Sequence, residues 1–397
     1  MCMTTNFNLY YNIWNNEEPV PNGNSSFEPE KISGTTIFLN GDFHNILHSA
    51  GVSFNLVKSY DTPFIYPMHL RLSENYNTDF HKPFSEIIPE HIVNRINKNG
   101  ILVITDDEGH DFGPATLKKE CIKVGVDLDK ILYLTCNTKS IKEQTLKTMF
   151  YSCCINDILA PLATSQAARN TFKKLLSNKP EYFLCSLSNR CDEHKAIMTS
   201  LLFEEGFITK ENLITFRAPP KNRAGYKYLS SLINPDLLNL SPLIDKFVEG
   251  DGILVKGNYS FGNFEAFGHC ELVLMNQTPR NSKYRNFNRK NSHWGNTQQM
   301  ASILLKKPFL INADVPFLPS VKEFGFKTFD TVWDESYDEE TDLHKKAIKI
   351  VKILKDIKKD KEILKECEDI TEYNFKHALK YDYNYKIVQE LEKMLKT

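Results

Sequence analysis

Short runs of apolar residues recur along the chain, and most segments between them carry apolar residues at helical spacing. These runs end in polar or turn residues, as expected of strands that are buried on both faces. We expect strands at residues 35–41, 101–104 and 131–137 in the first half of the chain, and at residues 182–188, 211–217, 270–277 and 308–312 in the second. Strands that alternate with helices in this way predict an α/β fold with parallel sheets.

The segment 306–338 combines several of these signals. Residues 308–312 predict a strand, residues 316–325 predict a helix that ends at a C-capping Gly325, and residues 328–333 return to period two, which predicts a second strand. We expect the polar residues that follow to form one rim of a ligand site: Asp334, Glu335, Tyr337 and Asp338. An ordinary βαβ unit with a solvated acidic loop explains the same pattern.

The length of 397 residues suits two domains of ordinary size. We predict an irregular lead-in at residues 1–30, a first α/β domain at 31–178, a second at 179–340 and a C-terminal helical segment at 341–397. The pattern of strands restarts after the tetrapeptide Ser-Asn-Lys-Pro at residues 177–180. In the last part, Ile and Leu recur every three or four residues, so we expect its many lysines to form a solvated helix face.

Composition and charge exclude several classes of protein. Hydrophobic residues make up 41% of the chain and charged residues 25%, which is typical of globular proteins, and 49 Lys and Arg balance 50 Asp and Glu. No net field therefore attracts the whole molecule to nucleic acid or to an anionic membrane. Nine cysteines without CxxC pairs, and the lack of a signal peptide or membrane span, predict a soluble, cytoplasmic protein with reduced thiols. The sequence has no P-loop, GxGxxG or GxSxG motif at a useful place, which argues against kinases, nicotinamide enzymes and serine hydrolases.

Polar clusters follow the predicted strands at residues 40–44, 106–111, 189–194 and 334–338. Because ligands bind at the carboxyl ends of parallel strands, we expect these clusters to face one cleft between the two domains. A general base is a carboxylate or an imidazole within reach of an acceptor hydroxyl. The candidates are Asp107, Glu108 and His110, with Asp42 and His44 as a rival pair. We expect no metal, because adjacent acids on one loop usually include some that face solvent.

Two other clusters are suited to phosphate groups. Asn189 and Arg190 precede a predicted helix that includes His194, and backbone amides at a helix start favour a diphosphate. Alternatively, Asp192 caps this helix and pairs with Arg190, while His194 merely packs. The only strongly basic segment with interleaved aromatic residues, 279–295, offers phosphate or nucleic-acid contacts through Arg280, Lys283, Arg285, Arg289 and Lys290. A surface loop explains this segment equally well.

Several of these segments together resemble a known family. The order of a strand with an NR-x(3)-H turn at 182–194, the strand ELVLMNQT, a helix leading to KKPFLI, and KEFGFKTFDTVWDESYD is similar to glycosyltransferase-like proteins of bacteriophages, large DNA viruses and some bacteria. ITDDEGHDFGP and ILYLTCN in the first domain agree with it. The resemblance covers about residues 100–350 and is strongest over 306–338. It implies a GT-B fold, in which two Rossmann-like domains face a central cleft that holds a nucleotide-sugar without a metal or another cofactor.

The sequence departs from the family at two places. Asn296, Thr297 and Gln298 stand where the family usually has Thr-Glu-Lys, and Gln277 stands where a Glu follows the preceding strand. In the family, that Glu and Lys look placed to bind the ribose and phosphates of the donor, so two charge-assisted contacts are missing. The resemblance implies this donor-binding set: Asn189, Arg190, His194, Gln277, Thr297, Gln298, Glu335, Tyr337 and Asp338.

The expected function is therefore transfer of a sugar from a nucleotide-diphosphate donor to a hydroxyl acceptor, which is a glycan, a protein or a modified phage DNA base. A viral source would place the protein in the host cytoplasm. The main alternative is a protein of the same shape that has lost catalysis and serves in binding or assembly. An epimerase or a phosphorylase on the same architecture is a third reading.

Overall fold

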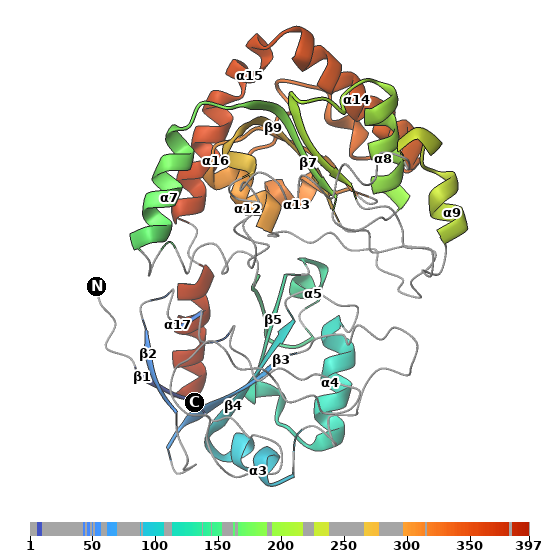
Figure 1. Ribbon diagram of the computed structural model, residues 1–397. Coiled ribbons are helices and arrows are strands. Elements are labelled where there is room, and N and C mark those ends of the chain that lie inside the picture. The colour runs from blue at the N-terminus through green and yellow to red at the C-terminus, as the bar shows by residue number, and fades with distance from the viewer. Residues whose placement is uncertain are drawn as a thin grey trace. The chain divides into compact units, whose positions relative to one another are not determined.

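The computed structural model, shown in Figure 1, divides into two compact units. Unit 1 comprises Met1–Thr164 and Asp382–Thr397, and unit 2 comprises Ser165–Tyr381. The structure describes residues 6–9, 43, 46–47, 50, 52–56, 62–69, 88, 90–106, 113–136, 138–143, 145–152, 162, 166–188, 193–216, 226–237, 266–277, 297–313, 316–380 and 383–396. The chain thus crosses from unit 1 to unit 2 and returns for its last helix.

Unit 1 is built on a six-stranded parallel sheet with the strand order β2-β1-β3-β4-β5-β6. The strands are β1 (Asn6–Leu9), β2 (Ser53–Leu56), β3 (Phe64–His69), β4 (Gly100–Asp106), β5 (Ile131–Thr135) and β6 (Thr148–Phe150). The helices are α3 (Glu90–Asn99), α4 (Gly113–Val124), α5 (Thr138–Lys142) and α17 (Tyr383–Leu395), with a 3₁₀ turn, η1, at Leu128–Lys130. Helix α17 contacts β4, so the end of the chain completes the unit that its beginning started.

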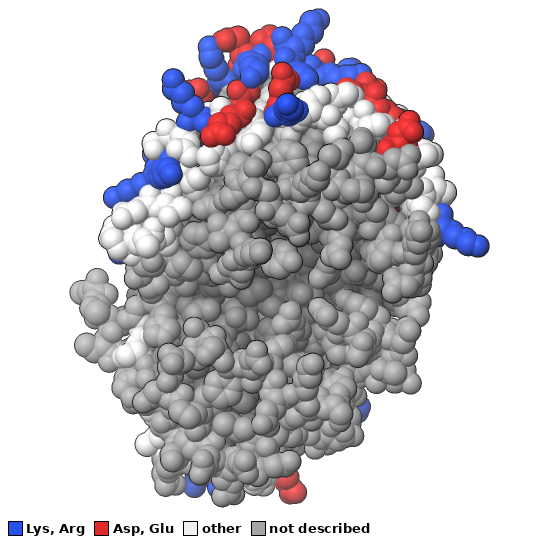
Figure 2. Space-filling model, in the orientation of Figure 1, with Lys and Arg blue, Asp and Glu red and all other residues white. Residues whose placement is uncertain are grey.

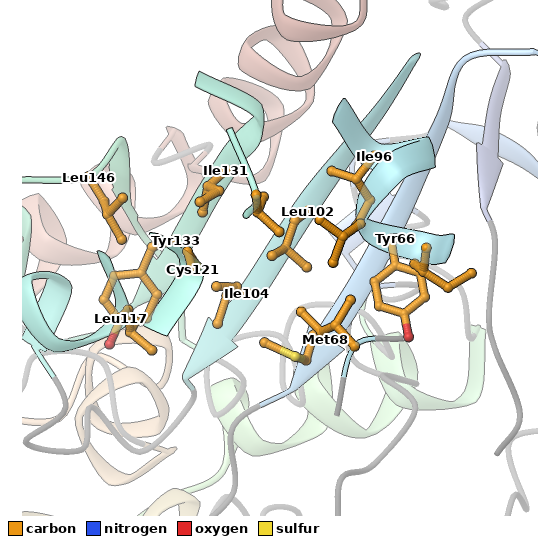
Figure 3. Packing of buried hydrophobic residues seen from close by; sticks show 14 of the residues in the cluster. Tyr66, Met68, Ile96, Leu102, Ile104, Leu117, Cys121, Ile131, Tyr133 and Leu146 are labelled. Carbon is orange, nitrogen blue, oxygen red and sulfur yellow. The ribbon is translucent and has the colours of Figure 1, made fainter. Parts of the chain in front are cut away.

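The core of unit 1 explains why its strands are continuous apolar runs. Figure 3 shows side chains of β3, β4 and β5 packing against α3 and α4. The strands contribute Tyr66, Met68, Leu102, Ile104, Ile131 and Tyr133, and the helices contribute Ile96, Leu117 and Cys121. On β4, Ile101 and Val103 alternate with the residues of this cluster and are also fully buried. A strand that is covered on both faces has no polar positions to alternate with, so the runs predicted at 101–104 and 131–137 are confirmed as β4 and β5.

The prediction of an irregular lead-in at residues 1–30 is wrong at Asn6–Leu9. These residues form β1, which pairs with β2 on one side and with β3 on the other. Phe7 and Leu9 are buried, so the four residues alternate polar and apolar within an otherwise Asn-rich stretch. Such a short alternation is hidden by composition until a neighbouring strand is known. The strand expected at 35–41 lies outside the described residues.

The sequence also did not predict β3, which contains Pro67. Proline is usually confined to strand edges because it has no backbone N–H. In the structure, β3 pairs with β4 along its whole length but with β1 only at Leu9 and Ile65. The described pairing with β1 does not include Pro67.

Unit 2 contains a four-stranded parallel sheet with the order β10-β9-β7-β8. Its strands are β7 (Tyr182–Ser188), β8 (Asn212–Phe216), β9 (Cys270–Asn276) and β10 (Phe309–Asn312), which confirms all four predicted strands. The helices are α7 (Gln166–Ser177), α8 (Glu193–Glu204), α9 (Tyr226–Ser231), α12 (Thr297–Leu304), α13 (Leu318–Glu323), α14 (Leu343–Lys359), α15 (Glu362–Glu366) and α16 (Glu368–Lys380), with a 3₁₀ turn, η2, at Glu335–Tyr337. Helix α8 packs on α14 and α12 packs on α16, and Figure 1 shows these pairs on opposite faces of the sheet.

Both units therefore confirm the predicted α/β class with parallel sheets. Within the described ranges, no helix combines the length and the apolar character that crossing a membrane requires. The charged helices at the C-terminal end of unit 2 carry basic and acidic side chains interspersed, as Figure 2 shows, and some of them pair, such as Lys365 with Glu362 at 2.7 Å. These exposed pairs agree with the predicted solvated face and contribute little to stability.

The second strand predicted at residues 328–333 is wrong, because this segment forms turns. The backbone N–H groups of Val332 and Trp333 both donate to the Phe329 carbonyl, at 2.9 and 3.0 Å. The Phe329 ring stacks on Trp333, with centroids 4.8 Å apart, and meets Phe309 of β10 edge to face. An alternation of apolar and polar residues over six positions fits a strand, and it also fits a turn whose aromatic side chains pack on one strand. The sequence does not distinguish the strand from the turn.

Gly325 ends α13 as predicted, with a φ of 80°. Its N–H donates to the Lys322 carbonyl and the Phe326 N–H donates to the Val321 carbonyl, which are the two bonds of a Schellman motif. A β-carbon at Gly325 would lie 2.9 Å from Nε2 of His377, the atom that contacts the Phe324 carbonyl at 2.8 Å. Helix α16 is thus packed so closely on this turn that a side chain has no room.

We expect Gly325→Ala to lower the free energy of unfolding by about 2 kcal/mol, from left-handed strain plus the contact with His377. Gly206 is a matched control, because it ends α8 with a φ of 70° and the same two bonds, yet a β-carbon there would meet nothing within 4 Å. Gly206→Ala should cost about 1 kcal/mol, from strain alone. Urea denaturation measures both, and equal losses would contradict the close packing of α16.

Candidate functional site

The order of strands in unit 2 places a switch in direction between β7 and β9. From β7 the chain adds β8 on one side of the sheet and then β9 on the other. In open parallel sheets, ligands bind outside the carboxyl ends of the strands at such a point. The carboxyl ends of β7, β9 and β10 are therefore the first place to look for a site in this unit.

Buried polar side chains meet at this edge. Nδ2 of Asn276, the last residue of β9, donates to Oγ of Ser186 in β7 at 2.8 Å. Nδ2 of Asn312, the last residue of β10, donates to Oδ1 of Asn276 at 2.9 Å and contacts the His194 carbonyl at 3.3 Å. All four residues are buried. We call Ser186, Asn276 and Asn312 the amide network, and it ties three strands to the first turn of α8.

His194 is an ionisable residue beside the amide network, because Asn312 bonds its backbone carbonyl. Its side chain is 1% exposed, and in the described part of the chain no side chain bonds either ring nitrogen. Burial holds the pKa of this imidazole well below its usual value of 6.5, and the charges of Lys195 and Lys346 lower it further, while the nearby backbone of Gln277 acts in the opposite direction. His194 is therefore a neutral, buried ring that no described side chain bonds, which is uncommon in a protein interior and typical of ligand sites.

Asp338 stabilises the start of a helix. Its Oδ2 accepts hydrogen bonds from the N–H groups of Phe317 and Leu318, at 2.7 and 2.8 Å, and so caps the start of α13. The residue is 2% exposed; burial raises the pKa of the carboxyl, while the two amide bonds and the charge of Lys346 lower it. Among the described residues, Oδ1 of Asp338 is buried and has no hydrogen-bond partner. One carboxylate oxygen thus caps α13, and the other accepts no described hydrogen bond.

The other residues of the predicted acidic rim differ in burial, so they do not form one exposed rim. Asp334 is exposed and caps Ser336, whereas Glu335 accepts from the Phe329 N–H at 2.8 Å, and burial raises the pKa of its carboxyl. Tyr337 is fully buried, which raises the pKa of its phenol well above the usual value. Their roles in donor binding stay predictions.

Lys346 is a residue that the sequence reasoning missed. It is fully buried, and its ammonium donates to the carbonyls of Ala313 at 2.8 Å and Asp338 at 3.1 Å. The prediction that the lysines of this helix are solvated is therefore wrong for Lys346. The spacing held a signal, because Lys346 lies one turn before Ile350 and Leu354 on the buried stripe of α14.

No family model matches this chain, and no curated protein matches its sequence. The resemblance to glycosyltransferase-like proteins is therefore carried by the residues quoted for it and by no comparison.

Three further residues of the predicted donor set lie in the described part of unit 2. Gln277 follows β9 directly and is buried, and its backbone N–H donates to the Asn312 carbonyl at 3.0 Å. Thr297 is the first residue of α12, and Gln298 follows it with a partly exposed side chain. The backbone order of unit 2 thus brings Gln277 to the amide network, as the predicted donor set requires.

The remaining predicted residues lie outside the described ranges, and their roles stay predictions. These are Asp42, His44, Asp107, Glu108, His110, Asn189, Arg190, Arg280, Lys283, Arg285, Arg289, Lys290 and Asn296. The described part of the chain contains no group of three or more His, Cys, Asp and Glu residues suited to a metal ion. The amide network was missed because Asn276 and Asn312 are far apart in sequence, although each ends an apolar run.

Proposed function

We propose that this protein is a glycosyltransferase of the GT-B type that moves a sugar from a nucleotide-diphosphate donor to a hydroxyl acceptor. The observation that carries the proposal is the amide network at the carboxyl edge of unit 2, where Asn312 bonds both Asn276 and the backbone carbonyl of the buried His194. Two successive units that each hold a parallel sheet are compatible with this architecture. Such an edge suits the ribose, phosphates and sugar of a nucleotide donor.

In the proposed reaction, a base takes the proton of the acceptor hydroxyl while the acceptor oxygen forms a bond to the anomeric carbon of the sugar. The bond from that carbon to the diphosphate breaks, and the diphosphate leaves with its electron pair. Asp107, Glu108 and His110 are the candidate bases, with Asp42 and His44 as the alternative. Arg190 and the basic segment 279–295 supply positive charge to the diphosphate. The acceptor is a glycan, a protein or a modified DNA base.

The structure changes the role proposed for one donor residue. Because burial and two neighbouring ammonium groups keep His194 neutral, its ring offers hydrogen bonds and no positive charge. Its proposed partner is therefore a hydroxyl or carbonyl oxygen of the donor, and the departing diphosphate depends on Arg190 and the basic segment.

A thermal-shift titration with uridine, guanosine, adenosine and cytidine diphosphates tests donor binding. At about 100 times its Kd, the correct nucleotide should stabilise unit 2 by about 2.7 kcal/mol and raise its Tm by about 5–10 °C. Asn312→Ala removes the link between β10, Asn276 and His194, so we expect it to abolish most of this shift.

Asn374→Ala is the matched control for Asn312→Ala. Asn374 is also a buried asparagine of unit 2, and it bonds both backbone groups of Lys327 at 2.8 Å, away from the amide network. Both variants should lose stability through unpaired backbone or amide groups. Only Asn312→Ala should lose the ligand-induced shift, and a shift with none of the nucleotides in the wild-type protein would refute the donor site.

A second candidate is a protein of this shape that has lost catalysis and serves in binding or assembly. It is favoured by the neutral side chains of Gln277 and Gln298, which stand where the resembling family has Glu and Lys. Incubation with a panel of nucleotide-sugars discriminates the two functions. Slow hydrolysis of one donor requires a working site and supports the transferase, whereas binding without turnover supports the second candidate.

A further inference from the structure

Lys346 is held in an environment that is costly for a charged group. It projects from the first turn of α14 into the interior of unit 2, where its side chain is fully buried. An ammonium in such a place is tolerated only when hydrogen bonds replace its lost hydration. The carbonyls of Ala313 and Asp338 supply two of these bonds, at 2.8 and 3.1 Å. Three rotatable N–H donors on one compact charge suit such convergent carbonyls.

The two carbonyls belong to the residue that follows β10 and to the residue that caps α13. Ala313 directly follows Asn312 at the carboxyl end of β10, and Asp338 caps α13 through the N–H groups of Phe317 and Leu318. One ammonium therefore connects the end of the strand with the residue that fixes the start of the next helix. Both ends of the connection between β10 and α13 depend on Lys346.

This connection adjoins the proposed ligand site. Asn312 precedes Ala313 and carries the bonds to Asn276 and to the His194 carbonyl. The charge of Lys346 also acts on the imidazole of His194 directly, where it contributes to the lowered pKa. A change at Lys346 thus reaches the site by two routes, through the backbone of β10 and through the field at His194.

We propose that Lys346 is a positioning residue of this ligand site, which holds the end of β10 and the start of α13 so that Asn312 and His194 face the ligand in a fixed orientation. Its effect on the ligand rests on the proposed function, whereas its effect on His194 does not. A lysine that only fills the core would affect stability alone.

The test compares Lys346→Met, Lys346→Arg and the control Ile350→Ala. Ile350 lies one turn further along the same face of α14 and is also fully buried. The three measurements are the Tm, the Kd of the nucleoside diphosphate that the wild-type protein binds, and the ¹⁵N signals of the His194 ring, assigned with His194→Gln. Near-ultraviolet circular dichroism establishes that each variant is folded.

We expect Lys346→Met to weaken nucleotide binding at least about tenfold and to move the His194 ring signals. Ile350→Ala should lower the Tm while leaving the Kd within about twofold and the ring signals in place. Lys346→Arg keeps the charge but replaces the compact ammonium by a larger, planar guanidinium, so it should recover only part of the affinity. An unchanged Kd in Lys346→Met, or an equal loss of affinity in Ile350→Ala, would overturn the positioning role.

Failure of the proposed function gives a different result. If the wild-type protein binds no nucleoside diphosphate, the His194 signals and the amide hydrogen exchange of residues 309–318 decide the role of Lys346 without a ligand. Unchanged signals and unchanged exchange in Lys346→Met would then overturn it. If Lys346→Met does not fold, Lys346→Gln, which keeps an N–H donor without the charge, is judged by the same criteria.

Discussion

Replacement of Asp338 by alanine is expected to lower the free energy of unfolding of unit 2 by about 2–6 kcal/mol, because each buried N–H group left unpaired costs about 1–3 kcal/mol. The variant loses the carboxylate that accepts from the N–H groups of Phe317 and Leu318, and leaves these buried donors unpaired at the start of α13. It also removes a negative charge that interacts with the buried ammonium of Lys346. The loss of this one side chain therefore destabilises unit 2 in more than one way.

Guanidinium denaturation, followed by the fluorescence of Trp333, measures this loss. Trp333 is buried in unit 2, and replacing Trp14 and Trp294 by phenylalanine removes the other two indoles. Asp334→Ala is the control, because Asp334 is an exposed carboxylate four residues earlier that bonds only Ser336. Its loss should be far smaller, and Asp338→Asn should be intermediate because one amide oxygen still accepts. Equal stabilities for the two alanine variants would contradict the capping role.

Lowering the pH from 7 to 4.5 should destabilise unit 2 through the protonation of His194 in the unfolded chain. The folded state holds the pKa of this ring well below 6.5, whereas the unfolded chain titrates near 6.5. Below pH 6.5 the unfolded state therefore binds a proton that the folded state does not, and the free energy of unfolding falls as the pH falls. The contribution of the neutral ring is fully present above pH 6.5.

The difference between the wild-type protein and His194→Gln isolates this effect, because all other titrating groups are common to both. Denaturation curves at pH 7, 5.5 and 4.5 should show a shallower loss of stability in the variant. Met198→Leu is a control within the buried part of α8 that adds and removes no titrating group. It should follow the wild-type pH dependence, and parallel curves for the wild-type protein and His194→Gln would show that His194 takes up a proton in the folded state.

The predictions that succeeded concern elements whose signal is local. The runs at 182–188 and 270–277 became β7 and β9, because a strand covered on both faces must be apolar at nearly every position. Gly325 was predicted to end a helix because it follows residues with helical spacing, and its φ of 80° is one that glycine adopts easily. These features need no knowledge of a partner segment. The α/β class followed from them directly.

The predictions that failed concern segments whose partners are distant. Residues 328–333 alternate as a strand does, but Phe329 packs on Phe309 in a turn. Asn6–Leu9 form a strand only because β2 and β3 lie on either side. Lys346 looks like a surface lysine until the carbonyls of Ala313 and Asp338 are placed around it. In each case, the deciding energy comes from a contact that the local sequence does not contain.

The candidate site shows the same division. The sequence by itself determined that polar residues end the apolar strands, because a buried strand can carry them only at its tips. It also identified His194 and Gln277 as candidates. Only the tertiary structure decided that Asn276 and Asn312 bond to each other and that His194 is buried and neutral. It also decided that Lys346 bonds the carbonyl of Ala313, the residue after Asn312. Strand order and burial set these outcomes, since both hydrogen bonds and desolvation depend on which groups meet across the sheet and how much water remains between them.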